Sequence, residues 1–416
     1  MQSATKPTVS LPLPQSPFRH RRPNMEIGTL AAAVIGSALG GKVTLPNKEI
    51  DFDALFEFSQ SHNILPLVAY GLKKAELLPA EQKGRFANAL HIAMAVEATQ
   101  EIYLQRLSEA FREKEIKFMP LKGSVMKHLY PYPFLRTMCD LDIQYDTARK
   151  DEVTEILLQN DFSLDEASGT DGVNLSFLKP PYLHIEMHGV LMDADVPLYN
   201  RYFGRNFERT VPKNGSEVMF RDEDFFVFMV AHFAKHYFLG GTGLRSLADL
   251  WLYSHKKPNL DIPYIYKELK EINLDGFTKT ILGVAGVLFD GKPADEKQMN
   301  ICRYLFDSKT YGTQEHFETR NADSSDRGDY LKKRLFPDAE FMAINYPAVK
   351  KCKILLPLFW LIRLITVLFT GRAKSNDVTA VLSASKETLD ARNIDGKPII
   401  VRNEKFYDRK GKTDDD

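Results

Sequence analysis

The chain has 416 residues, of which 44% are hydrophobic, so it can bury a sizeable core and its length suggests two or three globular units. Lysine plus arginine and aspartate plus glutamate both number 55, so no net charge attracts an acidic membrane, and a large nucleic-acid partner is disfavoured. The three cysteines lie far apart without CxxC spacing, which argues against a disulfide scaffold or a thiolate zinc site and favours a reducing cytoplasm.

The first part of the chain divides into a leader and a helical region. Residues 1–24 are rich in proline, serine and basic residues, which predicts a disordered leader. A basic cluster before an apolar run imitates a secretion signal, but Glu26 and the proline-rich start count against one, and a first helix is expected from about Met25. Residues 25–113 repeat apolar positions at steps of three and four, which predicts an N-terminal helical region.

The hydrophobic period changes after residue 113. The segments EIKFMPLKG, CDLDIQYD, GVNLSFLK and YLHIEMHGVL have the pattern of strands, and short helices are expected near 124–130 and 148–160. This pattern predicts a mixed α/β core over residues 114–220. The helical period then returns and predicts a C-terminal helical region over 221–370, followed by a polar, flexible tail over 371–416.

One apolar run near the end needs a separate interpretation. Residues 354–369, ILLPLFWLIRLITVLF, fall short of the roughly 20 residues that a spanning helix needs. Their aromatic and aliphatic content favours a core helix, and a peripheral helix at a membrane surface is the alternative.

Three carboxylates and a Lys-Gly-Ser turn carry the candidate chemistry. Asp140 and Asp142 are two residues apart in a strand pattern, so they share a face and repel each other unless a cation lies between them. In the segment HIEMH, Glu186 shares one strand face with His184 and His188.

The order of these segments resembles an uncharacterised family of the polymerase-β-like nucleotidyltransferase superfamily, over roughly residues 25–370. That superfamily has a glycine and a small residue at a strand-to-helix turn, then a strand with Asp-x-Asp, then a third carboxylate on a later strand. The resemblance implies an α+β fold, with a polymerase-β-like core of mixed β-sheet between N-terminal and C-terminal helical regions. It implies an NTP substrate, with ATP as the expected donor, and the catalytic carboxylates Asp140, Asp142 and Glu186.

The residue types support these assignments. Carboxylate oxygens suit Mg²⁺ or Mn²⁺, so Asp140, Asp142 and Glu186 are the expected metal ligands, with Glu186 alternatively a general base or part of a structural ion pair. Phosphate binding is expected at the turn, where Gly123 lets a phosphate approach the backbone and Ser124 offers a hydroxyl donor.

Several nearby residues have two interpretations each. Lys122 is either a phosphate ligand or a surface lysine, and Arg136 either contacts phosphate or braces its loop. His184 and His188 either help to orient the metal or acceptor, or are hydrogen-bonded structural histidines. Two further pairs are spaced four residues apart: His232 and His236, for which a packed helix is favoured over zinc, and Arg245 and Asp249, expected to pair within their helix.

Three functions remain open from the sequence. The first is a metal-dependent nucleotidyltransferase that acts on a hydroxyl or phosphate acceptor and releases pyrophosphate. The second is a glycosyltransferase, although such folds usually build most of a Rossmann-like sheet before their Asp-x-Asp. The third is a non-catalytic relative that binds a nucleotide or a partner. The acceptor is not identified by the sequence, and a small molecule or protein is favoured over nucleic acid.

Overall fold

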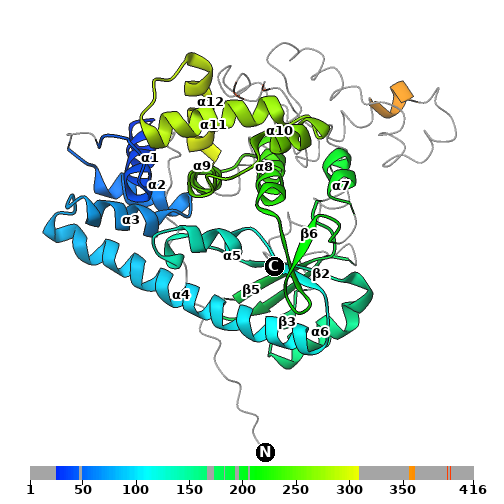
Figure 1. Ribbon diagram of the computed structural model, residues 1–416. Helices are drawn as coiled ribbons and strands as arrows, with labels where there is room; N and C mark the ends of the chain where they lie inside the picture. Colours follow the sequence, from blue (N-terminus) through cyan, green and yellow to red (C-terminus); the bar gives the residue numbers. More distant parts are fainter. Residues whose placement is uncertain are drawn as a thin grey trace, which may run out of the picture.

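The computed structural model describes residues 25–45, 49–165, 173–181, 183–192, 196–204 and 207–308, with short pieces at 356–360, 391 and 394. Within them the chain forms one mixed seven-stranded sheet with helices before, around and after it (Figure 1). The fold class expected from the sequence, α+β with a mixed sheet between helical regions, is therefore confirmed.

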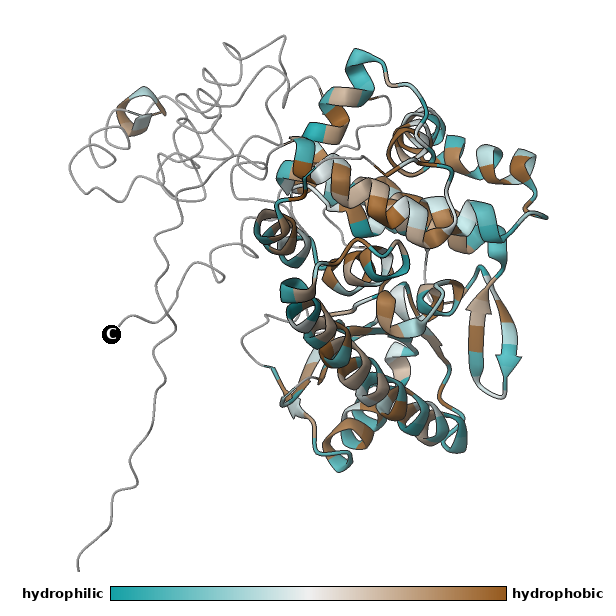
Figure 2. Cartoon of the chain, turned by 90° about the vertical axis from the view of Figure 1, so that its left-hand side faces the viewer, coloured by the Kyte–Doolittle hydropathy of each residue, from teal (hydrophilic) through white to brown (hydrophobic). Residues whose placement is uncertain are grey.

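Four helices precede the sheet, and the long fourth one reaches it. The first helix is described from Met25 on, and Asp51 caps the second by accepting a hydrogen bond from the Ala54 amide at 2.9 Å. Polar and apolar bands alternate along the helices, as amphipathic packing requires (Figure 2). The four are α1 (Met25–Leu39), α2 (Phe52–Ser61), α3 (Leu65–Lys74) and α4 (Ala80–Glu113).

The sheet has the strand order β3-β4-β5-β2-β1-β7-β6. Strand β2 pairs parallel to β5 and antiparallel to β1, and β1 pairs parallel to β7. The strands expected around residues 118, 141 and 183 are thus adjacent in the sheet. The strands are β1 (Phe118–Pro120), β2 (Leu141–Tyr145), β3 (Ser163–Leu164), β4 (Leu175–Lys179), β5 (Leu183–His188), β6 (Thr210–Asn214) and β7 (Glu217–Phe220).

Alternation gives this sheet one apolar face. Leu141, Ile143 and Tyr145 of β2 and the alternate residues of β5 pack with α4 and α6 in a buried cluster. The polar residues between them therefore lie on the opposite face. The short elements of the core are α5 (Gly123–Met126), η1 (Lys127–Leu129), η2 (Pro133–Leu135), η3 (Thr147–Arg149), α6 (Lys150–Gln159) and α7 (Pro197–Phe203).

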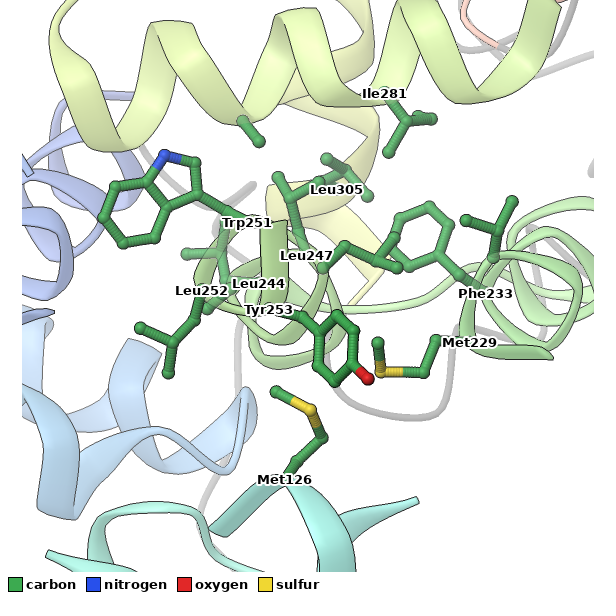
Figure 3. Close-up of a cluster of buried hydrophobic side chains, with 14 of the residues drawn as sticks. Met126, Met229, Phe233, Leu244, Leu247, Trp251, Leu252, Tyr253, Ile281 and Leu305 are labelled. Carbon is green, nitrogen blue, oxygen red and sulfur yellow. The ribbon is translucent and has the colours of Figure 1, made fainter. Parts of the chain in front are cut away.

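Helices from both flanks share a second, larger core. Residues of α1 to α3 are buried in the same cluster as residues of the helices that follow the sheet, and Figure 3 shows part of it around Leu247 and Trp251. The N-terminal and C-terminal helical regions thus enclose one hydrophobic interior. The five helices that follow the sheet within residues 207–308 are α8 (Asp222–Leu239), α9 (Leu244–Lys256), α10 (Ile262–Glu271), α11 (Asp275–Asp290) and α12 (Glu296–Ser308).

Some sequence expectations missed elements or fall outside the described residues. The sequence did not predict β3, β6, β7 or α7, which are short and weakly periodic. The leader at 1–24 and most of the tail at 371–416 lie outside the description, although Ala391 and Ile394 are described and buried. Of the apolar run at 354–369, residues 356–360 are described; they are helical and none is buried. In the described part of the chain, no helix is both long and apolar enough to cross a membrane.

Candidate active site

The candidate site lies on the polar face of β2 and β5. The parallel register places Asp142 opposite Glu186 and Gln144 opposite His188. Both strands turn their apolar residues toward α4 and α6, so the carboxylates of both strands share the other face. Because side chains alternate with a two-residue period, the polar residues of these two adjacent strands lie together on one face. This group of polar residues on β2 and β5 is called the seam.

The three predicted carboxylates converge on this seam. Ligand atoms of Asp140, His184 and Glu186 lie within 4.8 Å of one another, and so do those of Asp142, Glu186 and His188. Glu186 thus points to the same sheet face as both aspartates, as its assignment as the third carboxylate requires. Both histidines that were predicted as accessory residues join the cluster.

Of the three acids, Asp142 has its negative charge most directly balanced by neighbouring groups. Its Oδ1 accepts hydrogen bonds from Lys122 Nζ at 2.9 Å and from His188 Nε2 at 2.6 Å. Burial alone would raise the pKa of Asp142, but the charge of Lys122 and the bond from His188 outweigh burial and hold that pKa well below its usual range. Asp142 is therefore a carboxylate at any ordinary pH.

Asp140 has the opposite electrostatic environment. It stands one residue before β2, and burial together with the negative charges of Asp142 and Glu186 raises its pKa. Lys122 and Arg245 offset this only in part. The negative charges near Asp140 are therefore not fully balanced, and a bound cation there would reduce the repulsion between them.

The Lys-Gly-Ser turn lies beside these acids. Lys122 adopts a positive φ of 45° and caps α5, a helix of one turn that begins at Gly123 rather than at Ser124. A positive φ is unfavourable for lysine and recurs at functional sites. The Ser124 side chain is buried, and its Oγ has no hydrogen-bond partner among the described residues. Buried hydroxyl groups normally have a hydrogen-bond partner, so the Ser124 hydroxyl is the feature of the turn that best indicates a polar ligand.

Gly123 has a packing reason that the sequence did not reveal. The prediction was that glycine lets a phosphate approach the backbone. In the structure, a Cβ at this position would lie 2.5 Å from Met138 Sδ and 2.7 Å from Met138 Cγ. A side chain at position 123 therefore requires Met138, which precedes Asp140 by two residues, to move.

We expect Gly123→Ala to destabilise the protein by about 1–3 kcal/mol, because the added methyl group overpacks a buried contact. The double variant Gly123→Ala/Met138→Ala should recover part of this loss, since shortening Met138 removes the clash. Urea unfolding of the three variants measures both effects. An alanine variant as stable as the wild type would show that Met138 moves aside freely.

Arg136 braces its loop. Its Nε lies 2.8 and 2.9 Å from the two Asp249 oxygens, its Nη2 lies 2.6 Å from Oδ2, and Nη1 donates to the Thr137 carbonyl at 2.7 Å. Tyr130 donates to the same carboxylate at 2.8 Å. Of the two roles predicted for Arg136, the geometry supports bracing, because the guanidinium is buried and engaged by Asp249.

This contact corrects the expected pair within α9. Asp249 binds Arg136 of the preceding loop instead of Arg245, and Arg245 donates to the Thr137 carbonyl at 2.9 Å. Both α9 residues thus hold the loop that leads into β2. The sequence spacing of four could not reveal a partner that lies on another element.

Helix α8 approaches the polar face from the other side. His232 and His236 form a pair with 3.1 Å between their Nε2 atoms, and burial together with the charge of Lys122 lowers the pKa of His232 well below its usual value. The charge of His188 acts on His232 as well, which places this turn of α8 close to the seam. Neither histidine belongs to a metal-binding group among the described residues, and the packed-helix interpretation fits them.

Two residues of the site were missed in the sequence. Ser176 of β4 lies 2.7 Å from His184 Nε2, and Gln144 continues the polar face of β2 with its Oε1 lacking a hydrogen-bond partner among the described residues. The signal for Gln144 was present, because it follows Asp142 by two residues in a strand. Ser176 could not be found, since it depends on the pairing of β4 with β5.

Comparison with known proteins gives one match. The family model described as "Uncharacterised nucleotidyltransferase" matches residues 48–290, more than half of the chain, and this range contains every residue of the seam and of the turn. No curated protein and no solved structure matches the chain.

Proposed function

Because the chain belongs to the uncharacterised nucleotidyltransferase family, we propose that it transfers a nucleoside monophosphate from an NTP, with ATP the expected donor, to a hydroxyl or phosphate acceptor. Pyrophosphate is the other product. Asp140, Asp142 and Glu186 are the proposed catalytic and metal-binding residues, and Lys122 and Ser124 the proposed contacts to the nucleotide phosphates.

One observation carries this proposal. Parallel pairing of β2 with β5 brings Glu186 within 4.8 Å of a ligand atom of each aspartate, on the sheet face opposite the apolar cluster formed with α4 and α6. Three carboxylates gathered this closely repel one another, and burial together with this repulsion raises the pKa of Asp140. Such a site favours a divalent cation and the phosphates that accompany it.

The residues present fit a divalent metal. The donor set consists of carboxylate oxygens with adjacent imidazoles, and the buried Ser124 hydroxyl beside it lacks a partner among the described residues. Asp140, Asp142 and Glu186 would hold the metal, and a bound Mg²⁺ or Mn²⁺ supplies charge stabilisation for the transferring phosphoryl group.

The chain's own groups then have distinct tasks. The acceptor oxygen forms a bond to the α-phosphorus, the bond from that phosphorus to the bridging oxygen breaks, and pyrophosphate leaves with the electron pair. When the acceptor is a hydroxyl, its proton needs a base, and Glu186, whose side chain is 40% exposed, is the candidate for that role as the alternative to binding the metal. Lys122 contributes positive charge on the phosphate side, and Ser124 donates a hydrogen bond.

The order of strands favours this function over glycosyl transfer. In the described chain only the three-residue strand β1 precedes the Asp-x-Asp strand β2. A fold that binds a nucleotide-sugar usually places most strands of a parallel sheet before its Asp-x-Asp. The described chain does not, so its Asp-x-Asp does not match that fold.

The test is incubation of the full chain with each labelled NTP, Mg²⁺ or Mn²⁺, and a cell extract as the source of acceptor. We expect pyrophosphate release and transfer of label for at least one NTP, and loss of both on adding EDTA. Thermal shift with the same NTPs reports binding separately. Binding without pyrophosphate release from any NTP would contradict catalysis and support the non-catalytic alternative.

A further inference from the structure

A serine hydroxyl lies beside Glu186 at the edge of the seam. Strand β5 pairs with β2 on one side and with β4 on the other, and the two registers place both Asp142 and Ser176 opposite Glu186. Leu175 and Phe177 of β4 belong to the apolar cluster on the far face, so Ser176 between them faces the seam. Residues opposite each other on antiparallel strands have Cβ atoms about 4.5–5.5 Å apart, so Ser176 is a direct neighbour of Glu186.

The Ser176 hydroxyl also has a base within hydrogen-bond distance. Its Oγ lies 2.7 Å from His184 Nε2, and it donates to this nitrogen when the ring carries its proton on Nδ1. A ring nitrogen of His184 lies within 4.8 Å of carboxylate oxygens of Asp140 and Glu186. Carboxylates at this range stabilise the imidazolium that forms when the histidine takes up a proton. A hydroxyl, an imidazole and a carboxylate in this order are the arrangement that activates a serine nucleophile.

The β4 side of the seam is the side open to solvent. Ser176 itself is 5% exposed, but the side chain of Glu186 is 40% exposed, and Leu178, two residues along β4 on the same face, is 38% exposed. The side chain of Asp142, on the other side of Glu186, is only 9% exposed. A phosphate group bound at the carboxylates therefore has room to approach from the side on which Ser176 lies.

Building on the proposed function, we propose that Ser176 is an internal acceptor, so that the chain attaches a nucleoside monophosphate to itself. Ser176 Oγ forms a bond to the α-phosphorus of the NTP, and the hydroxyl proton passes to His184 Nε2. The bond from that phosphorus to the bridging oxygen breaks, and pyrophosphate leaves with the electron pair. The product is a phosphodiester that links Ser176 to the nucleoside.

The hydrogen bond to His184 distinguishes Ser176 from Ser124, the other buried hydroxyl of the site. Ser124 is also 5% exposed, but its Oγ has no hydrogen-bond partner among the described residues that could take its proton. Ser124 therefore keeps its role as a donor to phosphate. Because Ser176 is buried, a second molecule cannot place its own seam against this hydroxyl, and the transfer should occur within one chain.

The test is incubation of the full chain with each NTP labelled on its α-phosphate and with Mg²⁺ or Mn²⁺, followed by mass spectrometry of the intact chain and of its peptides. We expect one nucleoside monophosphate per chain, located at Ser176, at a rate that does not depend on the concentration of the chain. Ser176→Ala should lose the label. His184→Asn should slow labelling by about 100-fold or more, because a positioned base contributes at least this much.

The matched control is Ser163→Ala, at an exposed serine of β3 whose Oγ donates to the Leu178 carbonyl at 3.1 Å, and it should be labelled as the wild type is. When wild type is mixed with Asp140→Asn, only the wild-type chain should carry label. Thermal melts establish that each variant folds, and the peptide assignment in the wild type does not depend on any variant.

The inference and the proposed function fail in different ways. Label at another residue, label retained in Ser176→Ala, or transfer to an acceptor of the cell extract without any label on the chain would overturn the inference and leave nucleotidyl transfer standing. Binding of NTP with neither label nor pyrophosphate release would contradict the proposed function and the inference together.

Discussion

Replacing either Asp140 or Asp142 with asparagine is expected to lower nucleotidyl transfer by at least about 100-fold, because positioning and charge stabilisation are lost together. Asparagine keeps the volume of the side chain and removes the negative charge. The two variants should nevertheless differ in stability, since the structure gives the two aspartates opposite environments. Pyrophosphate release measures the first effect, and thermal melts without nucleotide or added metal measure the second.

Asp142→Asn should also destabilise the protein. Asp142 has a pKa held below its unfolded value by Lys122 and His188, so its charged form stabilises the fold above the unfolded pKa, and this stability is lost as pH falls through the folded pKa. Replacement of Asp142 with asparagine removes this stabilisation at neutral pH and leaves a largely buried Lys122 without its partner. Charged hydrogen bonds of this kind contribute about 1.5–3 kcal/mol.

Asp140→Asn should leave the melting temperature unchanged or raise it. The folded pKa of Asp140 lies above the unfolded value, so its contribution to stability is fully present only below the unfolded pKa and is lost as pH rises through the folded pKa. Removing the charge relieves repulsion at neutral pH. The matched control is Asp161→Asn, whose side chain is 88% exposed and pairs with Lys179.

Two outcomes would contradict this expectation. Transfer at the wild-type rate in both variants would exclude the aspartates from catalysis. A marked loss of stability in Asp140→Asn, with nucleotide response retained, would assign that residue a structural role.

Arg136→Met is expected to lower the free energy of unfolding by about 3–5 kcal/mol, because it strands a buried carboxylate. The side chains of Arg136 and Asp249 are 8% and 9% exposed, and several hydrogen bonds join them. The loss comes mainly from the unpaired Asp249, so the double variant Arg136→Met/Asp249→Leu should recover much of it. Urea unfolding of the single and double variants is the measurement.

The control is Arg149→Met. Arg149 pairs with Glu152, and the side chains of the two residues are 32% and 44% exposed. That pair should contribute little to stability, because solvent screens it. If Arg136→Met lowers the free energy of unfolding no more than this control does but weakens nucleotide binding, then Arg136 contacts phosphate, as the alternative prediction states.

The sequence by itself determined the alternation of the strands. Apolar residues at every second position of 141–145 and 183–188 required one buried face, and this requirement placed Asp142, Glu186, His184 and His188 on the other. The helical region that follows residue 24 and the strands around residues 118, 141 and 183 followed from the same kind of pattern. These features are local, because propensity and periodicity act over a few residues.

Only the tertiary structure decided which distant groups meet. Asp249 pairs with Arg136, 113 positions away, and Met138 packs on Gly123 through a loop whose path no periodicity encodes. Strand β7, missed in the sequence, joins β1 in parallel from nearly a hundred residues downstream. Side-chain pairing of this kind depends on how α8, α9 and the sheet come together around shared cores, and the free energy of that packing is a property of the whole chain rather than of any segment.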